Sequence, residues 1–137
     1  MAGKKANTVP PTRLLVVDDE ADFRSSVCRA LTLEGYAVEE AADGLEALVR
    51  LREESYNLVI LDLSMPRMNG LDLMESLRAG GQTAPPVIML SAFGDWGSYA
   101  RALELGVKAF LCKPLGMAEL MAAIQRTLAG CCANRAA

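Results

Sequence analysis

The sequence contains no histidine, few aromatic residues and no long apolar run. Aromatic residues make up 5% of its 137 residues. Without histidine, no imidazole can act as a general base or zinc ligand, and the chain cannot itself carry a phosphohistidine. No apolar run approaches the about 20 residues that cross a bilayer, and the polar start lacks the apolar core of a signal peptide. We therefore expect a cytoplasmic protein with no membrane role.

Neither basic charge nor cysteine pairing stands out in the composition. Lys and Arg number 14 against 17 Asp and Glu, which gives a net charge of -3. The basic residues are scattered, so we expect no direct contact with nucleic acid. The four cysteines are Cys28, Cys112, Cys131 and Cys132. None has CxxC spacing, and Cys28 and Cys112 lie in apolar patterns typical of small core residues, so no disulfide framework is expected.

The chain does contain five strand-like segments that alternate with amphipathic helical patterns. Four of them are apolar, and the second, at 36–41, has some polar character that suits an edge of a sheet. Hydrophobic residues make up 52% of the sequence, and its length suits a single domain. Predicted strands cover 14–17, 36–41, 57–62, 87–91 and 108–112, and predicted helices cover 20–34, 44–54, 71–79, 98–105 and 117–128. This alternation predicts a parallel sheet with helices on both faces. We expect a flexible leader at 1–12, one domain at 13–129 and a flexible tail at 130–137.

Polar residues interrupt this pattern where the predicted strands end. The first strand is followed by Asp18 and Asp19, the third ends at Asp62, the fourth ends at Ser91, and Lys113 follows the fifth. The carboxyl ends of parallel strands share one edge of a sheet, so these side chains should converge. Three carboxylates in one cleft repel one another unless a cation joins them. Mg²⁺ is suited to such a cleft, because it prefers carboxylate, water and phosphate oxygens.

The same residues could carry out phosphoryl transfer. A carboxylate can act as the nucleophile and form an aspartyl phosphate. Lys113 could hold the incoming phosphate by its charge, and Ser91 could donate a hydrogen bond to a phosphoryl oxygen. Singly, each residue has an ordinary explanation, since a carboxylate at a strand end commonly caps the next helix. Their conjunction at four strand ends favours a functional site.

Four segments resemble the receiver domains of two-component response regulators, the family of the chemotaxis regulators. They are VVDDE at 16–20, LVILDLSMPRMNG at 58–70, VIMLSA at 87–92 and FLCKP at 110–114. The resemblance extends from residue 13 to about residue 128. It implies an α/β, flavodoxin-like, doubly wound five-stranded parallel sheet with strand order 2-1-3-4-5 in a three-layer α/β/α arrangement.

The resemblance also implies a role for individual residues. Asp62 would be the phosphoacceptor, Ser91 and Phe110 the switch residues, and Lys113 the cation that binds the phosphoryl group. Mg²⁺, which Mn²⁺ can replace, would be bound by Asp18, Asp19, Asp62 and the backbone carbonyl of Ser64. The bond between Lys113 and Pro114 would be cis, which X-Pro bonds permit at low cost. Ser64 and Phe93 occupy positions that modulate dephosphorylation, and the apolar Phe93 cannot itself orient a water molecule.

As a member of this family, the chain would be a regulatory domain rather than an enzyme, with only self-phosphorylation and autodephosphorylation of its own. Its phosphoryl donor would be a histidine kinase, a phosphotransfer protein or a small phosphodonor. Phosphorylation would change the surface formed by the fourth helix, fifth strand and fifth helix, within residues 95 to 125. A homodimer through that surface is a further expectation.

Three alternatives remain from the sequence. A flavodoxin-type cofactor binder would need a Ser-, Thr- or Gly-rich phosphate loop after the first strand, where this chain has Asp18, Asp19 and Glu20. A phosphatase resembling haloacid dehalogenases would have a D-x-D pair there, whereas Asp18 and Asp19 are adjacent. A degenerate receiver that only binds proteins is disfavoured, because the acidic set is complete.

Overall fold

Strands and helices alternate along the chain. The computed structural model describes residues 11–92 and 96–136. The strands are β1 (Arg13–Val17), β2 (Ala37–Ala41), β3 (Leu58–Asp62), β4 (Val87–Ser91) and β5 (Ala109–Cys112). The helices are α2 (Ala21–Leu33), α3 (Gly44–Glu53), α4 (Gly70–Ala79), α5 (Tyr99–Glu104) and α6 (Met117–Ala136), with a short 3₁₀ helix η1 (Trp96–Ser98) before α5.

The five strands form one parallel sheet with the order β2-β1-β3-β4-β5, which confirms the expected order. Every residue of β3 and β4 is buried, as the continuous apolar runs predict, while the edge strand β2 carries Glu39 and Glu40. The chain adds β2 on one side of β1 and then β3 on the other side, so the strand order reverses between β1 and β3. Ligands of such sheets bind beside the carboxyl ends of these strands.

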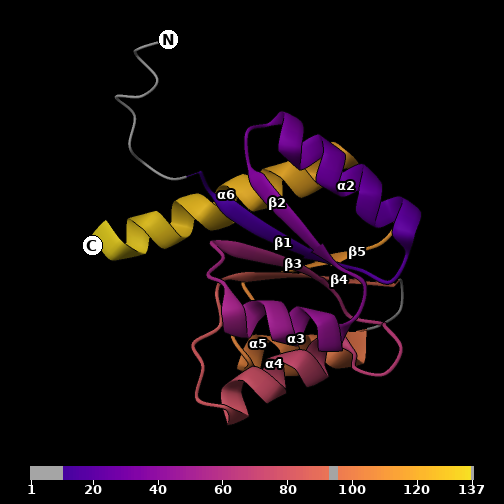
Figure 1. The fold of residues 1–137 in the computed structure, drawn as a ribbon. Coiled ribbons are helices and arrows are strands. Elements are labelled where there is room, and N and C mark those ends of the chain that lie inside the picture. The colour runs from indigo at the N-terminus through magenta and orange to yellow at the C-terminus, as the bar shows by residue number, and fades with distance from the viewer. Residues whose placement is uncertain (1–10, 93–95, 137) are drawn as a thin grey trace.

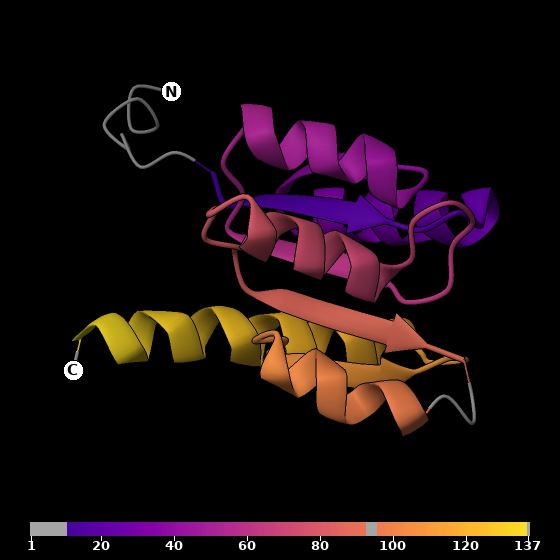
Figure 2. The same ribbon diagram turned by 90° about the horizontal axis from the view of Figure 1, so that it is seen from below.

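Helices cover both faces of the sheet, so the three-layer arrangement is confirmed (Figure 1). Helices α2 and α6 lie over one face, where Leu31 and Ile124 pack with Val16 and Ile60. Helices α3, α4 and α5 cover the other face and lie side by side when the molecule is seen from below (Figure 2). Because side chains alternate along each strand, neighbouring residues enter different layers of the core.

Local capping explains where several helices begin and end. Asp43 caps α3 by accepting a hydrogen bond from the backbone N–H of Glu46. At the start of α4, Asn69 and Asp72 form a full capping box. Gly35 follows α2 with φ of +99°, a left-handed conformation that glycine adopts readily after the last turn of a helix.

The last helix is longer than expected. Helix α6 continues to Ala136 instead of ending near residue 128, so the backbone of the expected tail from residue 130 is helical. The stretch contains alanines and no proline, and its one glycine, Gly130, weakens the helix without ending it. The division of the chain into leader, domain and tail stays a prediction. Residues 93–95, including Phe93, lie outside the described residues.

The remaining expectations concern cysteines and membranes. Cys28 and Cys112 are both free thiols, as predicted for core residues of this kind. Burial raises the pKa of the Cys28 thiol to about 12, which leaves it protonated and unreactive near neutral pH. In the part of the chain that the structure describes, no helix combines the length and the apolar character that crossing a membrane requires.

Candidate functional site

Four strands deliver polar side chains to one edge of the sheet. Asp18 directly follows β1, Asp62 ends β3, Ser91 ends β4 and Lys113 directly follows β5. Asp18, Asp62 and Ser91 are at most 5% exposed, which is unusual for polar residues outside a functional site. Each strand is held in register by its buried apolar neighbours, so the positions of these side chains are set by the sheet.

The three carboxylates predicted to bind a metal do come together. One carboxylate oxygen from each of Asp18, Asp19 and Asp62 lies within 4.8 Å of the other two. Asp18 and Asp62 are buried, whereas Asp19 is exposed at the mouth of the cluster. Acidic oxygens at this spacing fit a hard divalent cation that keeps some of its water.

The environment of Asp62 works against ionisation of its carboxyl group. Burial and the negative charge of Asp18 raise the pKa of Asp62 to about 7, despite the opposing attraction of Lys113. A backbone hydrogen bond from Ser64 also lowers this pKa, but by less. Asp62 is therefore partly protonated near neutral pH, and a bound cation would favour the ionised form that acts as a nucleophile.

Lys113 supplies the positive charge of the site. Its ammonium group donates a hydrogen bond to Asp18 over 2.9 Å and lies 3.8 Å from a carboxylate oxygen of Asp62. It is also 3.9 Å from Glu20 and 4.4 Å from the centre of the Phe23 ring. The bond between Lys113 and Pro114 is cis. The lysine thus bridges the ends of β1 and β3 from the end of β5.

Ser91 has a buried hydroxyl group with no hydrogen-bond partner among the described residues. Such groups are uncommon, because a buried hydroxyl loses its bonds to water. Ser91 lies one residue beyond Leu90, which pairs with Asp62 in the sheet. A phosphoryl oxygen on Asp62 could accept this missing hydrogen bond, so the unsatisfied hydroxyl fits a bound phosphoryl group.

The loop after Asp62 is held by contacts that sequence analysis missed. Arg67, with φ of +69°, forms an ion pair with Asp43 at the start of α3. A Cβ atom on Gly44 would lie 2.6 Å from the carbonyl oxygen of Met68, and one on Gly70 would lie 2.9 Å from that of Asp62. Only glycine permits these close approaches. Gly70 was visible in the sequence as the last residue of the segment at 58–70 that resembles receiver domains, whereas nothing local linked Asp43 to Arg67.

The loop also carries the backbone carbonyl of Ser64. The N–H of Leu63 donates to the carbonyl oxygen of Leu90 over 2.8 Å, and the N–H of Gly70 donates to that of Leu63 over 2.9 Å. The first bond ties the start of the loop to β4, and the second ties the end of the loop back to its start. The role of Ser64 as a metal ligand stays a prediction.

Phe110 lies on β5 opposite Met89, two residue pairs before the last pair, Ser91 and Cys112, at the edge of the sheet. It is partly buried against the layer formed by α3, α4 and α5, and its ring meets that of Tyr99 edge to face at 5.3 Å. The aromatic pair joins β5 to α5. This position suits a residue that couples the site to an outer surface, but its switch role stays a prediction.

A doubly wound parallel sheet with an acidic cluster, a lysine and a free hydroxyl at its carboxyl edge defines a class of metal-assisted phosphoryl acceptors. Within that class, the chain belongs to the response regulator receiver domain family, whose model matches residues 14–125. The chain is therefore a receiver domain of the two-component type, a signalling domain whose known role is to accept a phosphoryl group. The flavodoxin-type and phosphatase alternatives are set aside by this membership.

Named relatives are similar over the same region. The chain is 37% identical to the response regulator MprA of Mycobacterium sp. (strain KMS) over 118 residues, which covers 86% of this chain and 51% of MprA. It is 42% identical to the alkaline phosphatase synthesis transcriptional regulatory protein SphR of Synechococcus elongatus over 122 residues, which covers 82% of this chain and 47% of SphR. The chain thus spans about half the length of the curated relatives it matches.

Solved structures agree with the fold. A response regulator receiver protein from Pseudomonas putida matches with a TM-score of 0.80 and 30% identity, covering 87% of this chain and 99% of that one. The chemotaxis protein CheY4 of Vibrio cholerae matches with a TM-score of 0.79 and 30% identity, covering 86% and 99%. Because some relatives are transcriptional regulators, the expectation of no contact with nucleic acid is not supported for a longer protein.

Proposed function

We propose that Asp62 is the residue of this receiver domain that accepts the phosphoryl group. The observation that carries the proposal is its burial at the end of β3, between the acidic pair and the ammonium group of Lys113. A carboxylate oxygen of Asp62 attacks phosphorus, and the bond from phosphorus to the donor's nitrogen or oxygen breaks. The donor leaves as imidazole or, from acetyl phosphate, as acetate.

The site takes up Mg²⁺ through Asp18, Asp19, Asp62 and the backbone carbonyl of Ser64, and Mn²⁺ can replace it. The acidic cluster supports this assignment, because its three carboxylates need a cation to offset their repulsion. A cation held by these residues would supply charge neutralisation for the phosphoryl oxygens. Lys113 binds one phosphoryl oxygen and Ser91 donates a hydrogen bond to another.

The phosphoryl donor is a histidine kinase or a phosphotransfer protein, since receiver domains of response regulators act with such partners. The chain performs only self-phosphorylation and autodephosphorylation and is otherwise not an enzyme. It acts in the cytoplasm, a proposal that rests on the family alone.

Phosphorylation is transmitted through Ser91 and Phe110. The free hydroxyl of Ser91 moves toward the phosphoryl group, and Phe110 rotates into the space that this movement leaves. The surface of α5, β5 and α6 then changes, and a homodimer can form through it. We treat this as a population shift between two existing states, biased by one to three charge-assisted hydrogen bonds.

The test is the intact mass of the protein after incubation with acetyl phosphate. Wild type should gain one phosphoryl group with Mg²⁺ or Mn²⁺ and none in EDTA, and Asp62→Asn should gain none. Asp22→Asn, an exposed aspartate in the first turn of α2, is the matched control and should label like wild type. Equal labelling of Asp62→Asn and wild type would overturn the assignment of Asp62.

A further inference from the structure

One aromatic residue beside the site has no part in the function described so far. Phe23 is the third residue of α2 and is partly buried against the core layer shared by α2 and α6. The ammonium group of Lys113 lies over its ring, 4.4 Å from the ring centre. An aromatic face attracts a cation at this distance through its quadrupole, most strongly where water is partly excluded.

Four groups surround the Lys113 ammonium. The nearest is Asp18 at 2.9 Å, followed by Asp62 at 3.8 Å, Glu20 at 3.9 Å and the Phe23 ring. The Lys113 side chain is 21% exposed and the Glu20 side chain is 64% exposed, so water weakens the contact with Glu20. Phe23 also lines a cavity of about 360 Å³ together with Glu20, Ala92, Lys113, Pro114 and Leu115.

A divalent cation at the acidic cluster would change this balance. Asp18 would then use its carboxylate to bind the cation, and the two positive charges would repel each other. Lys113 would then lose its hydrogen bond to Asp18, its shortest contact, when Asp62 is about to accept the phosphoryl group. The Phe23 ring is uncharged and does not bind Mg²⁺, so it remains available to the ammonium group.

We propose that Phe23 is a positioning residue for phosphoryl transfer. Its ring face keeps the ammonium group of Lys113 beside Asp62 once a cation occupies Asp18. The inference rests on the roles proposed above for Asp62 and Lys113. It adds that the first turn of α2 contributes an aromatic surface to the reaction as well as to the core.

A graded series at position 23 separates this role from simple packing. Site-specific replacement of Phe23 by its monofluoro, difluoro and pentafluoro analogues weakens the ring quadrupole while nearly preserving its size. With saturating Mg²⁺, the rate of labelling of Asp62 by acetyl phosphate should fall stepwise, by about three- to tenfold across the series. Phe23→Leu should match the slowest analogue, and Phe23→Trp should restore the rate. Melting temperatures in EDTA report any loss of packing.

Nuclear magnetic resonance tests the contact itself. The Hε resonances of Lys113, identified by their absence in Lys113→Ala, should be shifted upfield by the Phe23 ring. In wild type this shift should persist when Mg²⁺ is added, and in Phe23→Leu it should be lost. Disappearance of the shift on adding Mg²⁺ to wild type would overturn the proposal, because the ammonium group would have left the ring.

Equal labelling rates across the fluorinated series would also overturn it and leave Phe23 as a core residue. Mg²⁺-dependent labelling of Asp62 in wild type shows that the proposed function holds, so a negative result at position 23 then counts against the role of Phe23 alone. If wild type shows no Mg²⁺-dependent label on Asp62, the proposed function fails first, and the inference fails with it.

Discussion

At the scale of single residues, the feature that matters most is the cost of ionising Asp62. The carboxyl group is buried beside Asp18, and these two effects outweigh the attraction of Lys113. The same residue that makes the site chemically useful therefore opposes folding of the metal-free protein when it is charged. Active sites commonly sacrifice stability in this way.

We predict that Asp62→Asn stabilises the metal-free protein in a pH-dependent manner. The pKa of Asp62 is about 7 in the folded state and near its ordinary value of 3.8 when unfolded. The folded state therefore holds an extra proton between these values, and wild type loses stability as pH rises through this window. Relative to wild type, the asparagine variant should gain stability from about pH 4 to about pH 7 and then level off. The gain is at most about 4 kcal/mol, since one pKa unit corresponds to about 1.4 kcal/mol.

Urea unfolding in EDTA at several pH values measures this difference. Asp22→Asn serves as the control, because Asp22 is exposed on α2 and should show no such trend. A difference between wild type and Asp62→Asn that stays constant from pH 4 to pH 7 would contradict the raised pKa. Added Mg²⁺ should stabilise wild type more than the variant by mass action.

At the scale of elements, the loop between β3 and α4 depends on a close backbone contact. We predict that Gly70→Ala destabilises the protein by about 1 to 3 kcal/mol and weakens Mg²⁺ binding. The added Cβ would lie 2.9 Å from the carbonyl oxygen of Asp62 and 3.2 Å from the Cα of Leu63. Both contacts are with backbone, so Asp62 or the loop must move. Thermal unfolding and a Mg²⁺ titration measure the two effects.

Gly80 at the other end of α4 provides the matched control. Its φ is -82°, and the nearest atom to an added Cβ is 3.4 Å away, so Gly80→Ala should fit without strain. It should be neutral or stabilising by about 0.5 kcal/mol, because alanine restricts the unfolded chain. Equal effects of the two substitutions would show that the contact at Gly70 has no special cost.

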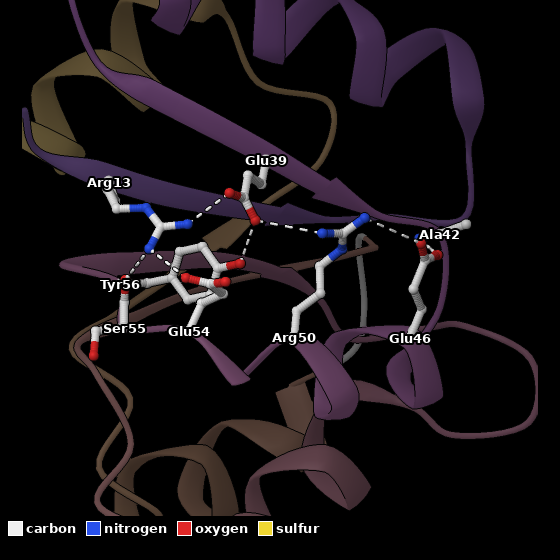
Figure 3. A network of polar contacts seen from close by, with 8 residues as sticks. All are labelled: Arg13, Glu39, Ala42, Glu46, Arg50, Glu54, Ser55 and Tyr56. Atoms are coloured by element: carbon white, nitrogen blue, oxygen red, sulfur yellow. Dashed lines mark hydrogen bonds and ion pairs between the residues drawn. The ribbon is translucent and has the colours of Figure 1, made fainter. Parts of the chain in front are cut away.

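A polar network ties the edge strand β2 to its neighbours (Figure 3). Glu39 on β2 accepts hydrogen bonds from Arg13 over 2.6 Å, from Tyr56 over 2.5 Å and from Arg50 over 3.4 Å. The bond from Tyr56 and the charge and hydrogen bond of Arg13 lower the pKa of Glu39 despite its partial burial. The network joins β1, β2, α3 and the segment before β3, at a distance from the acidic site.

We predict that Tyr56→Phe costs about 1 kcal/mol at pH 7 and less at pH 3. A carboxylate with a lowered folded pKa contributes stability above its unfolded pKa and loses it as pH falls through the folded value. Protonation of Glu39 therefore removes the charge that makes the Tyr56 bond strong. Urea unfolding at the two pH values measures the cost, with Tyr36→Phe as the control. An equal cost at both pH values would separate the Tyr56 contribution from the charge of Glu39.

At the scale of the whole molecule, the site and the outer surface are joined through β4 and β5. We predict that beryllofluoride with Mg²⁺, a mimic of the phosphoryl group, changes amide hydrogen exchange in α5, β5 and the start of α6. Ser91 lies at the end of β4, which pairs with β5, and Phe110 on β5 packs against Tyr99 of α5. A movement of Ser91 can therefore be transmitted through Phe110 to α5. Exchange measured by mass spectrometry with and without beryllofluoride tests this.

Ser91→Ala provides the internal control for this coupling. It removes a hydroxyl that has no partner in the described part of the metal-free structure, so it should leave stability unchanged or improve it. Mg²⁺ binding should persist, while the response of α5 and β5 to beryllofluoride should weaken. An undiminished response would mean that coupling follows another path, and changes limited to the loops beside Asp62 would defeat the switch.

Local patterns in the sequence were sufficient to locate the strands and helices and to identify the residues at the strand ends. Apart from the edge strand β2, each strand is a short apolar run, and each helix has an apolar face. The exceptions Asp18, Asp62, Ser91 and Lys113 interrupt those patterns. Parallel order then required them to meet at one edge. The segments resembling receiver domains added the strand order and the assignment of roles, which periodicity alone does not contain.

Tertiary structure decided what depends on residues far apart in the chain. Lys113 is closer to Asp18 than to Asp62, and it lies over Phe23, although 90 residues or more separate it from both Asp18 and Phe23 in the sequence. The raised pKa of Asp62 arises from burial and from a charge on another strand, and the unsatisfied hydroxyl of Ser91 arises from packing on all sides. Periodicity reports only which face a side chain occupies. Distances, burial and electrostatic coupling exist only after the strands have paired, so these properties of the site could not be obtained from the sequence.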